Sequence, residues 1–190
     1  LKMGDLLGVA GVVTHLGSHK GLGLEQALER LADGLMKSLS DSQDCLVLIE
    51  NSAGAGGNIG NSIDELAQIL HATGDHNRVK VCLDTAHLFA SGYNIRTPQG
   101  WDELVNEVDA KIGWDKVVVL HCNDSKVDLG AKVDRHENIG HGFIGEDGFR
   151  AILTHPKLKN SDLPLILEVP GMDGTGPDKA NLDKLKLLAG

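Results

Sequence analysis

The 190-residue sequence has few aromatic residues and few cysteines. Aromatic residues make up 3% of the chain, so its core must be built mainly from aliphatic side chains. The three cysteines are an odd number, lie far apart at Cys45, Cys82 and Cys122, and two of them fall within apolar runs. They favour reduced thiols in a protein of the cytosolic type over a disulfide framework. We therefore expect a cytoplasmic protein, or a nuclear or organellar one in a eukaryote.

Long apolar runs and an excess of positive charge are also missing. No run approaches the roughly 20 residues that span a bilayer, and no signal peptide is visible, so we expect no membrane partner. Lys and Arg number 18 against 27 Asp and Glu, and the net charge of -9 argues against binding nucleic acid through bulk positive charge. What the chain does have is 24 glycines, which indicate many tight turns, and nine histidines, which suggest metal binding.

The length and the hydrophobic fraction bound the number of domains. At 41% hydrophobic, 190 residues can form one core but hardly two, so we expect residues 1–190 to be a single domain. The sequence begins at Leu1 rather than Met, and residues 1–7 resemble the last turns of a helix. We expect this chain to be a fragment of a longer one.

Short aliphatic runs alternate with helical patterns along the chain. Five runs are expected to be buried strands: residues 8–14, 46–49, 79–83, 117–120 and 165–167. The spacing of apolar residues predicts helices at 24–39, 62–71, 99–112, 145–153 and 178–188. Continuous aliphatic strands that alternate with helices indicate a parallel sheet covered by helices.

Each predicted strand is followed at once by a residue that can bind a metal. These residues are His15, Glu50, Asp84, His121 and Glu168. The first four follow one another at nearly constant intervals, which favours a (β/α) barrel, a fold whose chemistry lies at the carboxyl ends of its strands. A single charged residue after a strand more often caps a helix or faces solvent. Five such residues in five strands indicate one shared polar site.

Three further donors are expected to join this site. His87 follows Asp84 by three residues, so both could lie on one turn of a strand-to-helix corner. Asp134 and His136 alternate in an extended loop and so point the same way. Mixed imidazole and carboxylate ligands suit catalytic zinc or manganese, with zinc favoured by the histidines. Eight donors exceed the needs of one tetrahedral ion, so two or three ions are implied.

The remaining candidates have more ordinary interpretations. Cys122 is expected to point away from the site because the strand alternates. The glycine loops at 54–60 and 140–145 do not match a phosphate-binding P-loop and instead suit sharp turns. Five histidines are expected to be ordinary solvated or hydrogen-bonded side chains: His19, His71, His76, His141 and His155.

Six ordered segments resemble the signatures of the endonuclease IV family of apurinic/apyrimidinic endonucleases. They run from about His15 to Glu168, and the first has Leu16 where a Pro is common: HLGSH, IENSAGAGGNIG, CLDTAHLFASGYNIRT, LHCNDSK, VDRHENIGHGFIG and LILEV. The resemblance implies an α/β fold, a (β/α)8 TIM barrel. This chain would hold only its last five βα units, with the first three strands absent.

The same resemblance implies three Zn²⁺ ions, with Mn²⁺ as a substitute at one position. Glu50 would be the carboxylate that two ions share, and the family's ninth ligand, a histidine, would lie in the absent part. The other ligands would be His15 for the first ion, Asp84, His121 and Glu168 for the second, and His87, Asp134 and His136 for the third.

The implied activity is a DNA-repair reaction on double-stranded DNA that contains abasic sites. Water activated by zinc would hydrolyse the phosphodiester 5′ to the abasic sugar, leaving a 3′-hydroxyl and a 5′-deoxyribose phosphate. Glu50 and Glu168 are the expected catalytic carboxylates, and Arg135 and Lys126 the expected phosphate contacts. Three Zn²⁺ ions would offset six of the nine formal negative charges.

Two other functions stay open. A metal-dependent sugar isomerase or epimerase of the related barrel type also uses Glu, Asp and His at strand ends, but it needs only one or two ions. An inactive fragment that binds metal or damaged DNA is the third interpretation, because a barrel without three strands has two unpaired edges. The absent N-terminal strands, or an associating chain, would then be needed as a partner.

Overall fold

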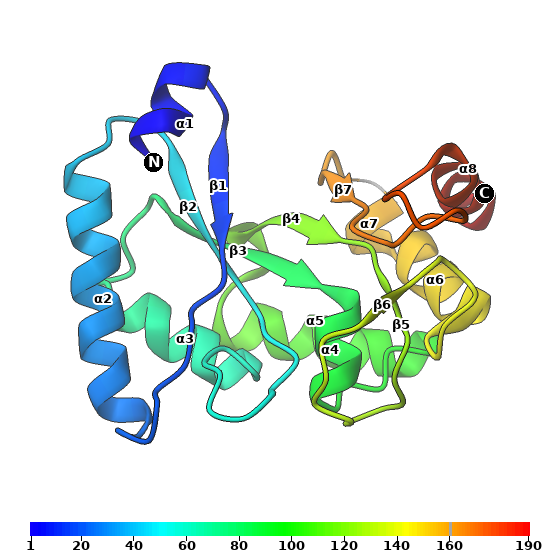
Figure 1. Cartoon of the computed structure of the whole chain (residues 1–190), viewed down its shortest axis with the longest axis horizontal. Coiled ribbons are helices and arrows are strands. Elements are labelled where there is room, and N and C mark those ends of the chain that lie inside the picture. Colours follow the sequence, from blue (N-terminus) through cyan, green and yellow to red (C-terminus); the bar gives the residue numbers. More distant parts are fainter. Residues whose placement is uncertain (160) are drawn as a thin grey trace.

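The fold is organised by five parallel strands that form one curved sheet (Figure 1). The computed structural model describes residues 1–159 and 161–190. The sheet order is β1-β2-β3-β4-β7, and each neighbouring pair is parallel. Its strands are β1 (Gly11–Thr14), β2 (Leu46–Glu50), β3 (Val79–Asp84), β4 (Val117–His121) and β7 (Leu165–Ile166). All five predicted strands are therefore confirmed, in the order in which they occur along the chain.

Helices separate the strands as predicted, with some corrections. The expected strand at 8–14 begins only at Gly11, because Gly8 ends the first helix with a left-handed φ of 66°. Of two further short helices, α4 was expected only as a corner after the third strand, with no range, and α7 was not predicted. The helices are α1 (Lys2–Leu7), α2 (Leu24–Ser40), α3 (Ile63–Ala72), α4 (Thr85–Ser91), α5 (Pro98–Lys111), the 3₁₀ turn η1 (Trp114–Lys116), α6 (Gly145–Thr154), α7 (Pro156–Lys159) and α8 (Lys179–Ala189).

Side-chain caps explain where several helices begin. The hydroxyl of Ser62 accepts the backbone N–H of Glu65 at the start of α3, and Thr97 caps α5 in the same way, directly before Pro98. The carboxylate of Asp178 caps α8. Such caps satisfy backbone donors that the first helical turn leaves free.

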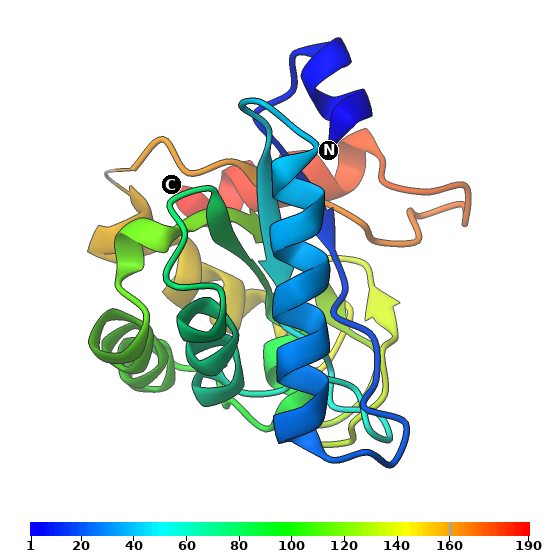
Figure 2. The same cartoon turned by 90° about the vertical axis from the view of Figure 1, so that its left-hand side faces the viewer.

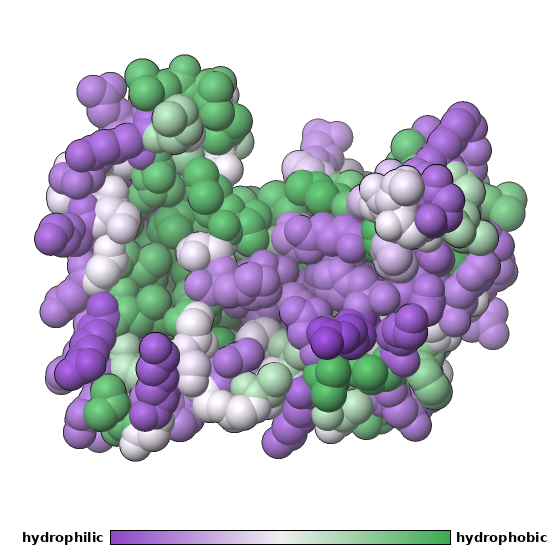
Figure 3. Space-filling view, viewed as in Figure 1, coloured by the Kyte–Doolittle hydropathy of each residue, from purple (hydrophilic) through white to green (hydrophobic). Residues whose placement is uncertain are grey.

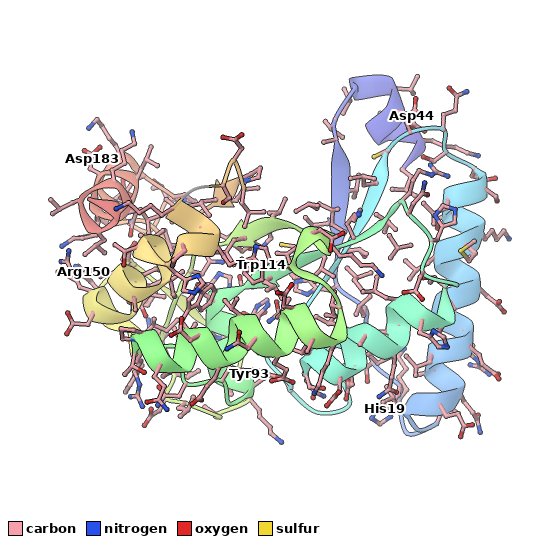
Figure 4. All side chains as sticks on the ribbon, turned by 180° about the vertical axis from the view of Figure 1, so that it is seen from behind. His19, Asp44, Tyr93, Trp114, Arg150 and Asp183 are labelled. Carbon is pink, nitrogen blue, oxygen red and sulfur yellow. The ribbon has the colours of Figure 1, made fainter. Side chains whose placement is uncertain are left out.

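The main core lies between the sheet and a layer of helices. Helices α2, α3, α5 and α6 pack side by side in that order, and Figures 2 and 4 show the first three as one layer over the sheet. Aliphatic side chains fill the space beneath them, together with the fully buried rings of Phe89, Trp101 and Phe149. The sequence expectation of an aliphatic core is confirmed.

The opposite face of the sheet carries a small second cluster formed by Leu48, Cys82 and Val119. Side chains two residues apart on a strand point to the same face. The residues two positions further along β2, β3 and β4 are Glu50, Asp84 and His121. The pleat of the sheet therefore places three predicted ligands on this face, at the carboxyl ends of their strands.

The sheet is not closed within the part of the chain that the structure describes. Strands β1 and β7 each have a neighbour on one side only, and apolar residues are exposed at both edges, including Val12 at 37% and Ile166 at 42%. Figure 3 shows apolar surface over α1 and β1, beside a hydrophilic band across the middle of the molecule. Among the described helices, none is long and apolar enough to cross a membrane.

Candidate metal centre

The eight predicted ligands come together at one end of the sheet. His15 follows β1 directly, Glu50 ends β2, Asp84 ends β3 and His121 ends β4. Glu168 lies two residues beyond β7, which ends at Ile166, one residue earlier than predicted. The other three ligands, His87, Asp134 and His136, come from α4 and from the segment that leads into β6 (His136–Glu137).

His121 is surrounded by three carboxylates. Its Nδ1 lies 3.0 Å from Glu50 Oε1, 3.0 Å from Glu168 Oε2 and 3.8 Å from Asp84 Oδ2. Glu50 and Asp84 are almost completely buried, at 3% and 0% exposure. Buried carboxylates this close together need a positive charge, and a cation held by all four side chains would supply it.

His87 and His136 form a second group with Asp134. Nδ1 of His87 lies 2.9 Å from the carbonyl oxygen of Asn51, which can only accept, so Nδ1 carries the proton. The free lone pair of the neutral ring is then on Nε2, which lies 3.1 Å from Asp134 Oδ1. His136 has the same arrangement, with Nδ1 3.3 Å from the carbonyl oxygen of Glu168 and Nε2 3.4 Å from Asp134 Oδ1.

These two Nε2 atoms are the observation that fits a metal best. Among the described residues, four buried side-chain nitrogen or oxygen atoms lack a well-directed hydrogen bond, and two of the four are Nε2 of His87 and of His136. Their nearest polar neighbours are carboxylate oxygens, with Asp134 Oδ1 at 3.1 Å from His87 and at 3.4 Å from His136. An ion between the two rings and the carboxylates would give each Nε2 lone pair a partner, so the residues present fit a bound metal.

His15 completes a third group from the open side of the site. Its Nε2 lies 3.6 Å from Glu50 Oε2, and its ring centroid lies 5.6 Å from that of His87. Among the described residues, the side chains form four groups, and within each group all the donor atoms lie within 4.8 Å of one another. The groups are His15, Glu50 and His87; Asp84, His87 and His136; Glu50, Asp84, His121 and Glu168; and Glu50, Cys82 and His121. Glu50 belongs to three of them, which suits a carboxylate shared between ions.

The carboxylates of this site favour the charged forms of two of its histidines, His87 and His121. Burial opposes protonation of His87, but Asp84, Asp134 and Glu50 outweigh it and raise its pKa to about 9. Burial likewise opposes protonation of His121, yet Glu50 and the other carboxylates raise its pKa. Burial opposes ionisation of Glu50, but His121 lowers its pKa. A metal ion would therefore replace protons on the histidines.

A short hairpin and a buried aspartate fix the segment that carries Asp134 and His136. Strand β5 (Asp124–Ser125) pairs with β6 in antiparallel fashion, with Ser125 opposite His136. The carboxylate of Asp124, fully buried, accepts backbone N–H groups from Gly140, Gly142 and Ile144. The segment expected to be a loop is thus partly a strand, held from both ends.

The expected phosphate contacts lie at the rim of this site. Arg135 is exposed and donates to the backbone oxygen of Asp134, and Lys126 is 65% exposed, with Nζ 3.7 Å from Glu137 Oε2. Of the other histidines, His19 lies beside the start of α2 (Figure 4), and His155 pairs with Asp102 at 3.0 Å. None of the remaining five belongs to a donor group in the described part of the chain, and neither does Cys122.

Sequence reasoning missed three buried residues that support the ligands. Cys82 lies beneath Glu50 and His121, and burial together with the Glu50 carboxylate raises the pKa of its thiol. Asn51 accepts the backbone N–H of Asp84 and donates to its carbonyl oxygen. Asn123 donates to the Asp84 carboxylate. The available signal for Asn123 was its position, two residues after His121 and thus on the same face.

Comparison with known proteins identifies the family. The family model described as a xylose isomerase-like TIM barrel matches residues 1–189. A probable endonuclease 4 of Methanoculleus marisnigri is 43% identical over the whole chain. The crystal structure of endonuclease IV from Thermus thermophilus superposes on 99% of the chain with a TM-score of 0.81 and 34% identity. The chain belongs to the endonuclease IV family of xylose isomerase-like TIM barrels.

The chain spans only part of the length of its relatives. The chain spans about two thirds of the relatives it matches, 67% of the Methanoculleus protein and 64% of the Thermus structure. The predicted fold class, a TIM barrel represented here by five βα units, is confirmed. A D-tagatose 3-epimerase-like protein also superposes on 97% of the chain, with a TM-score of 0.66, but at 15% identity it shows only the shared fold.

Proposed function

We propose that this chain is the metal-binding part of a DNA-repair endonuclease that hydrolyses the phosphodiester 5′ to abasic sites. The observation that carries the proposal is the convergence of eight imidazole and carboxylate side chains at the carboxyl ends of parallel strands. It is supported by the two buried Nε2 atoms of His87 and His136, which face carboxylate oxygens but make no well-directed hydrogen bond in the described part of the chain. Relatives about 40% identical to the chain are named probable endonuclease 4.

The donor sets suit three Zn²⁺ ions, with Mn²⁺ as a substitute at one position. His15 and Glu50 would hold the first, and Glu50, with Asp84, His121 and Glu168, the second. His87, Asp134 and His136 would hold the third, although His87 also lies within reach of the first. When bound, such ions make water acidic enough to act as a nucleophile near neutral pH and neutralise phosphate charge.

The chain's own residues would orient the substrate and keep the ligands in place. Glu50, buried and shared between groups, fixes the spacing of the site, and Glu168, 47% exposed on its side chain, faces the open side. We propose that both act as catalytic carboxylates by holding the metal ions that would face the reacting phosphate. Arg135 and Lys126, exposed at the rim, would bind neighbouring phosphates of a double-stranded DNA.

The experiment is incision of a duplex that carries one abasic analogue, with and without a chelator. Hydrolysis on the 5′ side predicts a nick that leaves a 3′-hydroxyl, which a polymerase extends directly. The undamaged duplex is the control for lesion specificity. A sugar isomerase would instead leave the duplex intact and convert a ketose, and its metal content would be one or two ions per site rather than three.

The edges of the sheet at β1 and β7, unpaired in the described part of the chain, suggest a partner that pairs with them. We propose that strands absent from this sequence, either N-terminal to it or on an associating chain, pair with β1 and β7. A chimera that joins to this chain the part of the Methanoculleus relative that it does not cover should incise faster than the chain alone. Equal activity per mole would show that no completion is required. A chimera that binds three ions but does not cut the abasic duplex would contradict the endonuclease proposal.

A further inference from the structure

Asn123 is a fully buried polar residue on the same face of the sheet as the predicted ligands. It follows His121 by two residues, just after β4, and its exposure is 0%. Its backbone N–H donates to the hydroxyl of Thr85, and that hydroxyl donates back to the carbonyl oxygen of Asn123 at 2.7 Å. The Asn123 backbone is thereby fixed against the segment that follows β3.

The side-chain amide of Asn123 connects two ligands from different strands. Its Nδ2 donates to Asp84 Oδ2 at 2.6 Å, and its Oδ1 accepts the backbone N–H of Glu168 at 2.7 Å. The other oxygen of Asp84 accepts the backbone N–H of His87 at 2.8 Å. One hydrogen bond on each oxygen holds the Asp84 carboxylate in one orientation, with its Oδ2 3.8 Å from His121 Nδ1 and 3.7 Å from His136 Nε2.

The amide of Asn123 helps to hold the Glu168 backbone, which follows a short strand. Strand β7 has only two residues and lies at an edge of the sheet. Its last backbone bond to β4 is from the N–H of Cys122 to the carbonyl oxygen of Ile166, at 2.7 Å. Beyond that point, the Glu168 N–H donates to Asn123 Oδ1, and the Glu168 carbonyl oxygen lies 3.3 Å from Nδ1 of His136.

We propose that Asn123 is a positioning residue that sets the geometry of the ligand group formed by Glu50, Asp84, His121 and Glu168. The inference rests on the proposed metal centre. The two roles require an amide, because Asp84 needs a donor and the Glu168 N–H needs an acceptor. A leucine of similar size provides neither. Residues that orient metal ligands in this way typically contribute about 10- to 100-fold to metal affinity.

The test is titration of the full 190-residue chain with Zn²⁺ and, for its spectrum, with Co²⁺. We expect Asn123→Leu to lower the affinity of the chain for one ion about 10- to 100-fold and to change the Co²⁺ absorption spectrum, while the affinity for the remaining ions stays the same. Asn123→Ser is a smaller change that guards against misfolding of the leucine variant, and it should weaken the same ion. Circular dichroism and urea unfolding, measured on the same samples, report how much chain is folded.

Asn181→Leu is the matched control. Asn181 is also buried, at 2% exposure, and its amide bonds Asn138, Asp178 and the backbone of Ile139 but none of the eight predicted ligands. Its loss should lower stability without weakening any ion. If Asn123→Leu and Asn123→Ser lower stability and leave every ion as tightly bound as in the wild type, Asn123 is only structural and the proposal is overturned.

The outcome for Asn123 is separable from the outcome for the proposed activity. Metal binding is compared between variant and wild type, whereas incision is measured on the abasic duplex. A wild-type chain that binds ions and does not cut DNA contradicts the endonuclease proposal, yet a selective loss of one ion in the Asn123 variants still supports positioning. A wild-type chain that binds no ion overturns both.

Discussion

Glu50 is the residue on which most of the metal centre depends. Its Oε1 lies 3.0 Å from His121 Nδ1, and its Oε2 lies 3.6 Å from His15 Nε2, so the two oxygens face different groups. Glu50→Gln keeps the size but removes the charge and leaves only one oxygen as a ligand. We expect at least one fewer bound Zn²⁺ per chain, measured by metal analysis after dialysis.

The effect on activity should be larger than that of a supporting residue. Residues that only orient metal ligands contribute about 10- to 100-fold to metal affinity or activity. Loss of a ligand shared between two ions should therefore slow incision by about 100-fold or more. Glu103→Gln, an exposed carboxylate on α5, is the control and should change neither quantity. Unchanged metal content in Glu50→Gln would show that its carboxylate does not bridge two ions.

His87 gives the metal-free chain a pH-dependent stability. Its pKa rises from 6.5 to about 9 on folding, because the carboxylates of Asp84, Asp134 and Glu50 outweigh burial. The rings of His15 and His136 also face it. A raised folded pKa means that the stabilisation is fully present below about pH 6.5 and is lost as the pH rises through about 9.

We therefore expect the urea midpoint of the chelator-treated chain to fall between about pH 6.5 and 9. His87→Gln should flatten this part of the curve, since glutamine does not titrate. A wild-type midpoint that stays constant or increases over this range would be inconsistent with a charged His87. Repeating the curve with Zn²⁺ present should remove the dependence on this residue, because the ion replaces its proton.

The predicted ligands could be found in the sequence because they obey local rules. A residue at the carboxyl end of a buried parallel strand lies on the same rim as its counterparts, so Glu50 and His121 could be grouped before any contact was known. Asn123 and Asp124 could not be assigned in this way. Their partners lie tens of residues away, at Glu168 and in the glycine loop around Gly142, and only the folded chain brings them together.

At the scale of elements, Asp124 holds the hairpin and the loop that follow β4. Its carboxylate accepts backbone N–H groups at 2.9 to 3.0 Å from Gly140, Gly142 and Ile144. Asp124→Asn would turn an N–H₂ group toward at least one of these donors and leave a buried N–H unpaired. We expect a loss of about 1–3 kcal/mol in the free energy of unfolding.

The destabilisation in Asp124→Asn should first affect the loop at residues 140–145 and not the whole fold. Hydrogen exchange of the amides at 140–145 should accelerate in Asp124→Asn, while the amides of β2 and β3 stay protected. Asp147→Asn, an exposed acid in the first turn of α6, is the matched control. Equal exchange rates at 140–145 in Asp124→Asn and the wild type would show that the carboxylate does not organise this loop.

Elements were predictable where a single period dominated the sequence. The continuous aliphatic runs gave all four longer strands, and α2 was evident from leucines at helical spacing. The range of helix α4 was missed because its first six residues, from Thr85 to Ala90, are all buried, so no polar stripe marks a helical period. Its start is set by Asp84, whose carboxylate accepts the His87 N–H, a contact that serves the helix and the site together.

At the scale of the whole molecule, the two faces of the sheet have different roles. One face packs against the helices and carries most of the core. The opposite face, called the inner face here, carries the small apolar cluster of Leu48, Cys82 and Val119 below the ligands. The carboxylates of Glu50 and Asp84 therefore lie at the rim of this inner face, next to its apolar cluster. Three divalent cations there would turn the rim into the part of an acidic protein that can accept a phosphate backbone.

The open edge at β1 predicts how copies of the chain associate with one another. Val12 is 37% exposed, beside backbone groups of β1 that have no second strand in the described part of the chain. Unpaired parallel edges with apolar side chains associate, so we expect the chain alone to self-associate as its concentration rises. Sedimentation velocity over a concentration series measures this. Val12→Lys should shift the distribution toward monomer, because a charged side chain at an edge opposes pairing.

Leu187→Lys separates an edge effect from a general gain in solubility. Leu187 is 70% exposed on α8 and belongs to neither edge strand, so the substitution removes at least as much apolar surface and adds the same charge. It should leave the sedimentation behaviour of the chain unchanged. If Leu187→Lys reduces association as much as Val12→Lys does, the contact is non-specific. A wild-type chain that stays monomeric at every concentration would show that the β1 edge does not drive association.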